Sequence, residues 1–360
     1  MPFDLASFPD HLAETTVARG NRRQVAAWLF AMCAMVLVMI ALGGATRLTG
    51  SGLSIMEWSP LSGAIPPLSA TEWDRLFALY QRTPQYQLVN HGFGLDGFKQ
   101  IFWLEWTHRL WGRALGLAFL APLAWFAVKG VIGRALLPRL AVLFVLGGMQ
   151  GGVGWFMVAS GFEADRVSVE PVRLVAHLSL ALALYVAMLW IALSQWRGPL
   201  RASRANLLLD WMTRSSIPLV ALTIVAGGLV AGMHAGLAYN SFPLMDGHLV
   251  PEGYASLVPI WRNMIGNVAA VQFDHRLLAT ASLVMVTATV LLGLARLPRG
   301  APRRALAALG LAMVTQYCLG VATLLSVVQI DLAVLHQICA VLLLTALLVT
   351  LHHLSRPAPP

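Results

Sequence analysis

Long apolar runs alternate with short polar segments along almost the whole chain. Each run has roughly 20 residues or more, the length that an α-helix needs to cross the hydrocarbon core of a bilayer. The pattern therefore predicts eight transmembrane helices, at approximately residues 25–45, 103–127, 138–160, 172–194, 216–236, 268–294, 305–327 and 332–353.

The polar segments between these runs differ in charge and in length. Arg and Lys gather before the first run and after the second, fourth and sixth runs. Because cytoplasmic loops carry the excess of Lys and Arg, both termini are predicted to be cytoplasmic. Two long loops, 46–102 and 237–267, then lie outside. Their content of Trp, Pro, Gly and Tyr predicts ordered caps, not flexible linkers.

Composition supports a membrane protein and narrows its location. The 360 residues are 58% hydrophobic and 11% charged, whereas soluble chains carry about 25% charged residues. The net charge of +9 follows from the loop cations, so it sets topology and does not indicate nucleic-acid binding. The acidic residues of the first segment do not fit an Arg-rich transit peptide, which favours a bacterial inner membrane.

The second half of the chain repeats the first. Gly43-Gly44 followed by Gly52-Leu53-Ser54 matches Gly227-Gly228 followed by Gly236-Leu237-Ala238 at a constant offset. Two further pairs of motifs match: His108-Arg109-Leu110 with His275-Arg276-Leu277, and Gln150 and Gly154 with Gln316 and Gly320. An even number of helices per half gives both halves the same orientation. The predicted fold is all-α and membrane-integral, with two four-helix bundles related by a pseudo-two-fold axis along the membrane normal. They span residues 25–200 and 201–354, between a cytoplasmic segment, 1–24, and a cytoplasmic tail, 355–360.

Four histidines stand alone in the even-numbered runs. They are His108, His177, His275 and His336, and the predicted topology puts all of them near the outer ends of their helices. One such histidine could simply hydrogen-bond a neighbouring helix. An ionisable side chain at membrane depth is costly, however, and usually marks function. The repeat predicts one pair of metal ligands per bundle, and a b-type haem is the natural occupant. No CxxCH motif for covalent haem attachment is present.

The residues beside these histidines suggest further roles. Arg109 and Arg276 follow their histidines, and each could pair with a haem propionate or reach toward lipid phosphate. Glu105, one turn before His108, corresponds to Gln272 before His275. A carboxylate in one half only favours a catalytic part for Glu105, as a proton acceptor or by stabilising positive charge, although Asp274 weakens the contrast.

Other polar residues lie outside these repeated motifs. Arg113 lies deeper in its run than Arg109, and its role is left open. Glu57 and His91, in the first outer loop, could close over a substrate, or could simply be solvated. His352 and His353, near the end of the chain, are expected in solvent.

These motifs together resemble one family. Four segments carry the resemblance, which extends over about residues 22–354: Gly43–Ser54, Glu105–Arg109, Gln150–Gly154 and Phe273–Arg276. They are similar to haem A synthases, of the branch without a cysteine pair in the first outer loop.

The resemblance implies an oxidoreductase that converts haem O to haem A for cytochrome oxidase. The C8 methyl group would become a formyl group through a hydroxymethyl intermediate. His275 and His336 would then bind a resident haem b, whereas His108 and His177 would bind the substrate, with Glu105 as the catalytic carboxylate. The implied partners are haem O synthase, an electron-transfer protein and membrane lipid, and a homo-oligomer is left open.

Two other functions fit parts of the same pattern. A di-haem b-type electron-transfer cytochrome linked to quinone would need the four histidines but not the difference between Glu105 and Gln272. A transporter built from parallel repeats would bind its substrate near the bilayer midplane, whereas the polar groups here lie near the outer ends.

Overall fold

The computed structural model describes residues 16–60, 62–164, 166–197 and 207–355. Within them, eight helices are long and apolar enough to cross a membrane. They are α1 (Thr16–Leu48), α4 (Leu95–Val128), α5 (Leu137–Ser160), α6 (Pro171–Arg197), α7 (Leu207–Gly232), α9 (Val268–Arg296), α10 (Ala301–Leu325) and α11 (Ile330–Leu354). The described residues contain no β-strand, only one isolated bridge between Met245 and His248. The all-α membrane fold is therefore confirmed. The N-terminal segment up to residue 15, the linker 198–206 and the tail 356–360 lie outside the described residues.

Local sequence explains where several helices begin. Pro171 opens α6, and prolines occupy the first turn of α5 and α10, where the missing N–H has no intrahelical partner to lose. Asn267 caps α9 by accepting hydrogen bonds from Ala269 N at 3.0 Å and Ala270 N at 3.4 Å. Helix α4 begins well before its predicted apolar run, because its first turns belong to the outer cap and carry polar residues.

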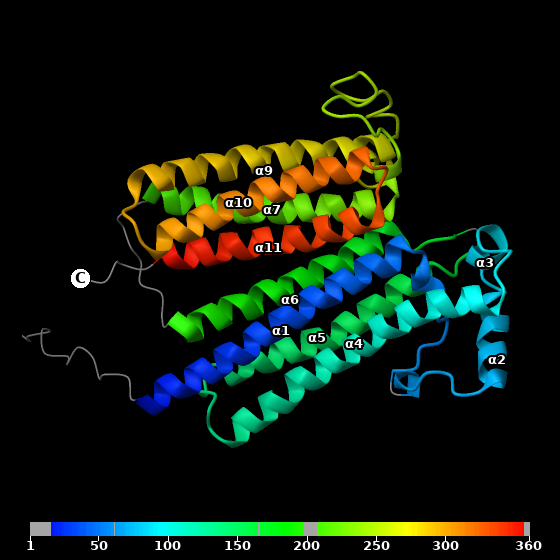
Figure 1. Ribbon diagram of the computed structural model, residues 1–360, viewed down its shortest axis with the longest axis horizontal. Helices are drawn as coiled ribbons and strands as arrows, with labels where there is room; N and C mark the ends of the chain where they lie inside the picture. Colours follow the sequence, from blue (N-terminus) through cyan, green and yellow to red (C-terminus); the bar gives the residue numbers. More distant parts are fainter. Residues whose placement is uncertain (1–15, 61, 165, 198–206, 356–360) are drawn as a thin grey trace, which may run out of the picture.

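Helices from the same half pack on one another. Helix α1 contacts α4 and α6, and α5 contacts α6; in the second half α7 contacts α9 and α10 contacts both α9 and α11 (Figure 1). The halves meet where α11 contacts α1 and α6, and where α6 contacts α7. The pseudo-two-fold axis and the domain boundaries stay predictions.

The end of α11 corrects one expectation. His352 is completely buried and its ring lies 5.6 Å from the Trp190 ring on α6. His353 contacts Arg197 at the end of α6. The prediction that these histidines face solvent was wrong for His352, because α11 continues to Leu354 and packs against the other half.

The described parts of both long loops are folded and lie at the end where α4, α6, α9 and α11 begin (Figure 1). The first loop contains α2 (Ala70–Tyr80) and α3 (Pro84–Leu88), and the second contains α8 (Asn263–Gly266). An aromatic cluster joins α2 to the start of α4: Phe98 is fully buried, with ring contacts to Tyr80 at 5.3 Å and Phe77 at 5.4 Å. The prediction of ordered caps is confirmed.

This cluster predicts the effect of a truncation. Phe98→Ala removes the buried ring on which α2 packs, and burying a phenylalanine contributes about 3–5 kcal/mol against alanine. We expect residues 70–88 to become sensitive to limited proteolysis in detergent while the transmembrane core stays intact. Gln100→Ala, an exposed position on the same helix, is the control. Equal protease resistance of both variants would contradict a stabilising role for the cluster.

Candidate functional site

The four histidines lie toward the end of the molecule that carries the long loops. His177, His275 and His336 lie in the first turns of α6, α9 and α11, and His108 lies further along α4, which begins in the outer cap. Each is half-buried although its helix is embedded in a bundle. The side chains are therefore bordered by open space and not sealed into a core.

The predicted pairs are brought together. The imidazoles of His108 and His177 are close enough to interact electrostatically, and so are those of His275 and His336. Among the described residues, no three His, Cys, Asp or Glu side chains converge as a metal site. A pair of imidazoles suits a metal whose remaining ligands come from a macrocycle.

Each histidine packs against a glycine of a neighbouring helix. A Cβ atom added to Gly43 would lie 3.2 Å from His108 Nε2, and one added to Gly227 would lie 2.9 Å from His275 Cε1. The same holds for Gly154 with His177 Cε1, at 2.9 Å, and for Gly320 with His336 Cε1, at 2.8 Å. Real Cβ atoms rarely approach this closely, so a side chain here would displace the ring. The sequence showed these glycines as repeats, but their contact with the histidines was not predicted.

Hydrogen bonds orient two of the rings. His275 Nδ1 lies 3.1 Å from the carbonyl oxygen of Thr223; when Nδ1 carries the proton and donates it there, Nε2 is free to bind a metal. The amide nitrogen of Gln150 donates to the His177 carbonyl oxygen at 2.9 Å and lies 3.2 Å from His177 Nδ1. In the described part of the chain, His336 Nδ1 and Gln316 Oε1 are buried without a hydrogen-bond partner. Paired, half-open imidazoles, one of which has its Nδ1 against a backbone carbonyl, would suit haem binding.

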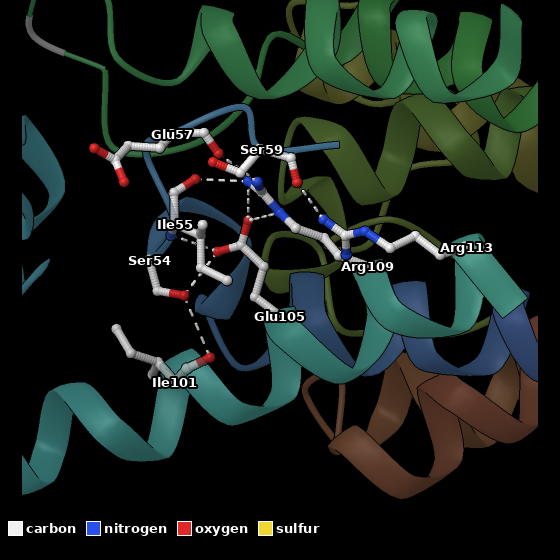
Figure 2. Close-up of polar contacts among 8 residues, drawn as sticks. All are labelled: Ser54, Ile55, Glu57, Ser59, Ile101, Glu105, Arg109 and Arg113. Atoms are coloured by element: carbon white, nitrogen blue, oxygen red, sulfur yellow. Dashed lines mark hydrogen bonds and ion pairs between the residues drawn. The ribbon is translucent and has the colours of Figure 1, made fainter. Parts of the chain in front are cut away.

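Beside His108, Glu105 and Arg109 form a buried clamp on the first outer loop (Figure 2). Glu105 is 2% exposed, and its Oε2 accepts hydrogen bonds from Ser54 Oγ at 2.7 Å and Ile55 N at 2.8 Å. Its Oε1 accepts from Arg109 Nε at 3.0 Å and Nη2 at 2.6 Å. Arg109 also donates to the carbonyl oxygens of Ile55 at 2.6 Å and Glu57 at 3.0 Å.

The second half has the same clamp with one change of chemistry. Arg276 donates to the carbonyl oxygens of Tyr239 at 2.6 Å and Ser241 at 2.9 Å, and to Gln272 Oε1 at 2.9 Å. The Gln272 amide nitrogen then donates to the carbonyl oxygens of Ala235 at 2.7 Å and Ala238 at 2.6 Å.

This comparison gives the Glu105 and Gln272 difference a physical reason. The first loop presents a hydroxyl and an N–H, which need an acceptor, whereas the second loop presents two carbonyls, which need a donor. A carboxylate only accepts and an amide does both. Glu105 accepts four hydrogen bonds, so its oxygens are engaged by the loop and by Arg109. The expectation that it accepts a proton from substrate stays untested, and this geometry instead favours positioning.

Spare buried donors border both sites. Arg113 donates to the carbonyl oxygens of Ser59 at 2.7 Å and Pro60 at 2.9 Å, so this deeper arginine also holds the loop. Its Nη1 and the Nε of Arg276 are buried without a partner in the described residues. Buried guanidinium N–H groups suit an anionic group such as a propionate, so the residues present fit a haem.

The side chains of Glu57 and His91, the two loop residues singled out from the sequence, contact other parts of the outer loop. Arg75 of α2 donates to both oxygens of Glu57 at 2.9 Å, and these hydrogen bonds hold the pKa of the Glu57 carboxyl below its usual value. His91 is exposed, with its ring 6.2 Å from the Tyr86 ring. Glu57 thus ties α2 to the loop that Arg109 holds. The contacts described for Glu57 and His91 include none of the four paired histidines.

Fold and site together define a polytopic helical membrane protein with two half-buried histidine pairs. Comparison with known proteins agrees with this class: residues 26–348 match the COX15-CtaA model, described as cytochrome oxidase assembly protein. The chain belongs to this family.

The relatives are similar over nearly the full length. The chain is 60% identical over 339 residues to the "Heme A synthase" of Granulibacter bethesdensis, which covers 94% of this chain and 89% of that protein. It is 47% identical over 338 residues to the protein of that name from Nitrosospira multiformis, covering 93% and 94%. It is 45% identical over 341 residues to that from Azorhizobium caulinodans, covering 94% and 96%.

The clamps predict the result of exchanging their acid and amide. In Glu105→Gln, one end of the side chain becomes a donor, so it can no longer accept from Arg109, Ser54 and Ile55 together. Leaving one buried donor unsatisfied costs about 1–3 kcal/mol. We expect faster amide hydrogen exchange in residues 54–60, and unchanged exchange in residues 235–241.

Gln272→Glu is the matched variant. Its carboxylate would face the carbonyl oxygens of Ala235 and Ala238 without a hydrogen to donate, so exchange should rise in residues 235–241 and not in 54–60. Unchanged protection of both loops in both variants would show that neither side chain holds its loop.

Proposed function

We propose that this protein is a haem A synthase that oxidises the C8 methyl group of haem O to a formyl group through a hydroxymethyl intermediate. The observation that carries the proposal is the presence of two histidine pairs, each ring seated against a glycine, in a chain whose close relatives bear that name. Converting a methyl to a formyl group removes four electrons and adds one oxygen atom, so the reaction needs both a substrate site and a route for electrons.

The two halves are assigned different roles. His275 and His336 would hold a resident haem b, which supplies one-electron transfer to or from an external partner. His108 and His177 would bind haem O as substrate. Arg276 and Arg109 would offer their remaining N–H groups to the propionates, and Arg113 adds one in the first half.

Charge supports this division. Glu105 neutralises Arg109 in the first half through a 2.6 Å ion pair. In the second half the partner is the neutral Gln272, and Asp246 is the acid that interacts with Arg276 electrostatically. A less neutralised guanidinium attracts anionic propionates more strongly at low dielectric. For the arginine that follows each histidine, this difference favours a cofactor that stays in the second half and a substrate that leaves as product in the first, whereas Arg113 adds a further cation to the first half.

Glu105 is proposed to act as a positioning residue. It holds Arg109 and the loop from Ser54 to Glu57 at the outer edge of the substrate site. By keeping this loop closed, the clamp would orient the haem edge and limit the access of water. The pair of Glu105 and Arg109 adds no net charge at this position, because the two side chains neutralise each other.

Haem extraction tests the proposal. The protein is purified after expression with and without a source of haem O, and its haems are separated by chromatography. We expect haem b alone in the first case, and haem O, its hydroxymethyl form or haem A in addition in the second. Haem b alone in both, at about two per chain, would favour the electron-transfer cytochrome instead.

The same assay examines the clamp. Glu105→Gln is expected to keep the resident haem b and to lower haem A formation, with substrate or hydroxymethyl product accumulating. Lys99→Ala, on the same helix but outside the clamp, should resemble the wild type. Normal haem A formation by Glu105→Gln would remove Glu105 from the mechanism.

The proposed location is the bacterial inner membrane, with both termini cytoplasmic and the histidine end of the bundle outside. Haem O synthase as donor of substrate and a separate electron-transfer protein are the proposed partners. A phosphatase fusion that is active only outside the cytoplasm, placed after Gly253 in the second outer loop, should be active, and one placed after Arg299 should be inactive. The reverse pattern would overturn this topology.

A further inference from the structure

The two diglycine pairs contact both halves of the molecule. Their first members, Gly43 on α1 and Gly227 on α7, seat the histidines of their own half, His108 and His275. The second members, Gly44 and Gly228, contact helices of the other half. The function proposed above assigns them no role.

Gly44 lies against the second half. A Cβ atom on Gly44 would be 2.6 Å from Oε1 of Gln337, the residue that directly follows His336 on α11. The Gln337 amide nitrogen also donates to the carbonyl oxygen of Ile40 on α1 at 2.9 Å. The helix that carries one ligand of the second half is therefore fastened to α1, one turn before the diglycine.

Gly228 lies against the first half in the corresponding way. A Cβ atom on Gly228 would be 3.1 Å from Leu178 Cδ2 and 3.2 Å from Val175 Cγ2. Leu178 directly follows His177 on α6. Each diglycine thus touches one histidine of its own half and, through the next residue, one histidine helix of the other half.

From these contacts we propose that Gly43-Gly44 and Gly227-Gly228 are crossed junctions, through which each half positions one haem ligand of the other. A side chain on Gly44 displaces the Gln337 amide, breaks its hydrogen bond to α1 and moves His336. A side chain on Gly228 pushes Leu178 and moves His177. The residues that follow the two histidines differ, so the junction at His336 is hydrogen-bonded and the junction at His177 is apolar.

The two junctions would fix the separation of the haem sites through helix contacts alone. Since no side chain intervenes at the glycines, the halves approach closely, and a shift at one site is transmitted to a ligand of the other. The inference rests on the proposed haem sites. It goes beyond them because it predicts that substitutions act across the interface.

The experiment compares four single alanine variants, at Gly43, Gly44, Gly227 and Gly228, in the purified full-length protein. The first readout is the resident haem: haem b retained per chain, and the low-spin EPR signal of iron between two imidazoles, which depends on their relative orientation. The second is haem O retained after expression with a haem O source. Gly116→Ala on α4, where a Cβ meets nothing within 4 Å, is the matched control.

The crossed junctions predict a specific pattern. Gly44→Ala and Gly227→Ala should shift the resident EPR signal or weaken haem b retention, by roughly 10–100-fold as for residues that orient metal ligands, whereas Gly43→Ala and Gly228→Ala should leave it unchanged and lower haem O retention. Shortening the facing side chain by Leu178→Ala in the Gly228 variant should recover part of the haem O retention.

Two outcomes overturn the inference. If the resident haem responds to Gly227→Ala and Gly228→Ala but not to Gly44→Ala, each half positions only its own ligands. If Gly116→Ala shifts the signal as much as Gly44→Ala, the effect is general to helix glycines. Two other results would instead contradict the proposed function. The wild-type protein would contain no haem b, or haem b would be retained in both the His275→Ala and the His336→Ala variant. If the Gly44→Ala protein does not accumulate, haem O retention by Gly228→Ala still tests whether one half positions a histidine of the other.

Discussion

The contact between an imidazole and the bare backbone of a glycine on the next helix is the constraint on which the site depends. It occurs once for each of the four histidines, with a hypothetical Cβ no farther than 3.2 Å from the ring. Protein interiors are close-packed, so one methyl group at such a position has to be accommodated by moving the ring or the helix. The glycines therefore fix how far each histidine stands from its neighbouring helix, and with it the space left on the other side of the ring.

The clamps at the outer ends hold a long loop in place over each membrane-embedded site. Both halves use an arginine directly after the histidine, and both arginines donate to two loop carbonyls. Because a buried guanidinium without partners is costly, the loop and the arginine stabilise each other. The side chain one turn before the histidine, acid or amide, supplies whatever hydrogen-bonding capacity the loop backbone leaves unfilled.

Much of the architecture could be predicted, because a bilayer imposes a length and an apolar composition on every span. The eight helices, the ordered outer caps and the pairing of His108 with His177 and His275 with His336 all followed from pattern and repeat. The fate of His352 could not be predicted, since a histidine near a helix end looks the same whether that end is in water or packed on α6. The hydrogen-bond partner of Glu105 could not be predicted from the sequence either. A spacing of three residues from His108 and of four from Arg109 are both compatible with contact on a helix, and only the loop backbone, with Ser54 and Ile55 as donors, decides that the carboxylate turns to Arg109.

The difference between Glu105 and Gln272 affects both how the outer loop is held and the charge beside each histidine pair. If the acid were present only to serve as a base, its lone pairs would need to be accessible, yet four donors occupy them. A neutral side chain in place of Glu105 would lose at least one of these hydrogen bonds and leave Arg109 buried beside a neutral partner, as Arg276 is beside Gln272. The first half would then acquire the electrostatic character of the second. Through its ion pair with Arg109, a carboxylate in this position thus keeps the half proposed to release its haem distinct from the half proposed to retain it.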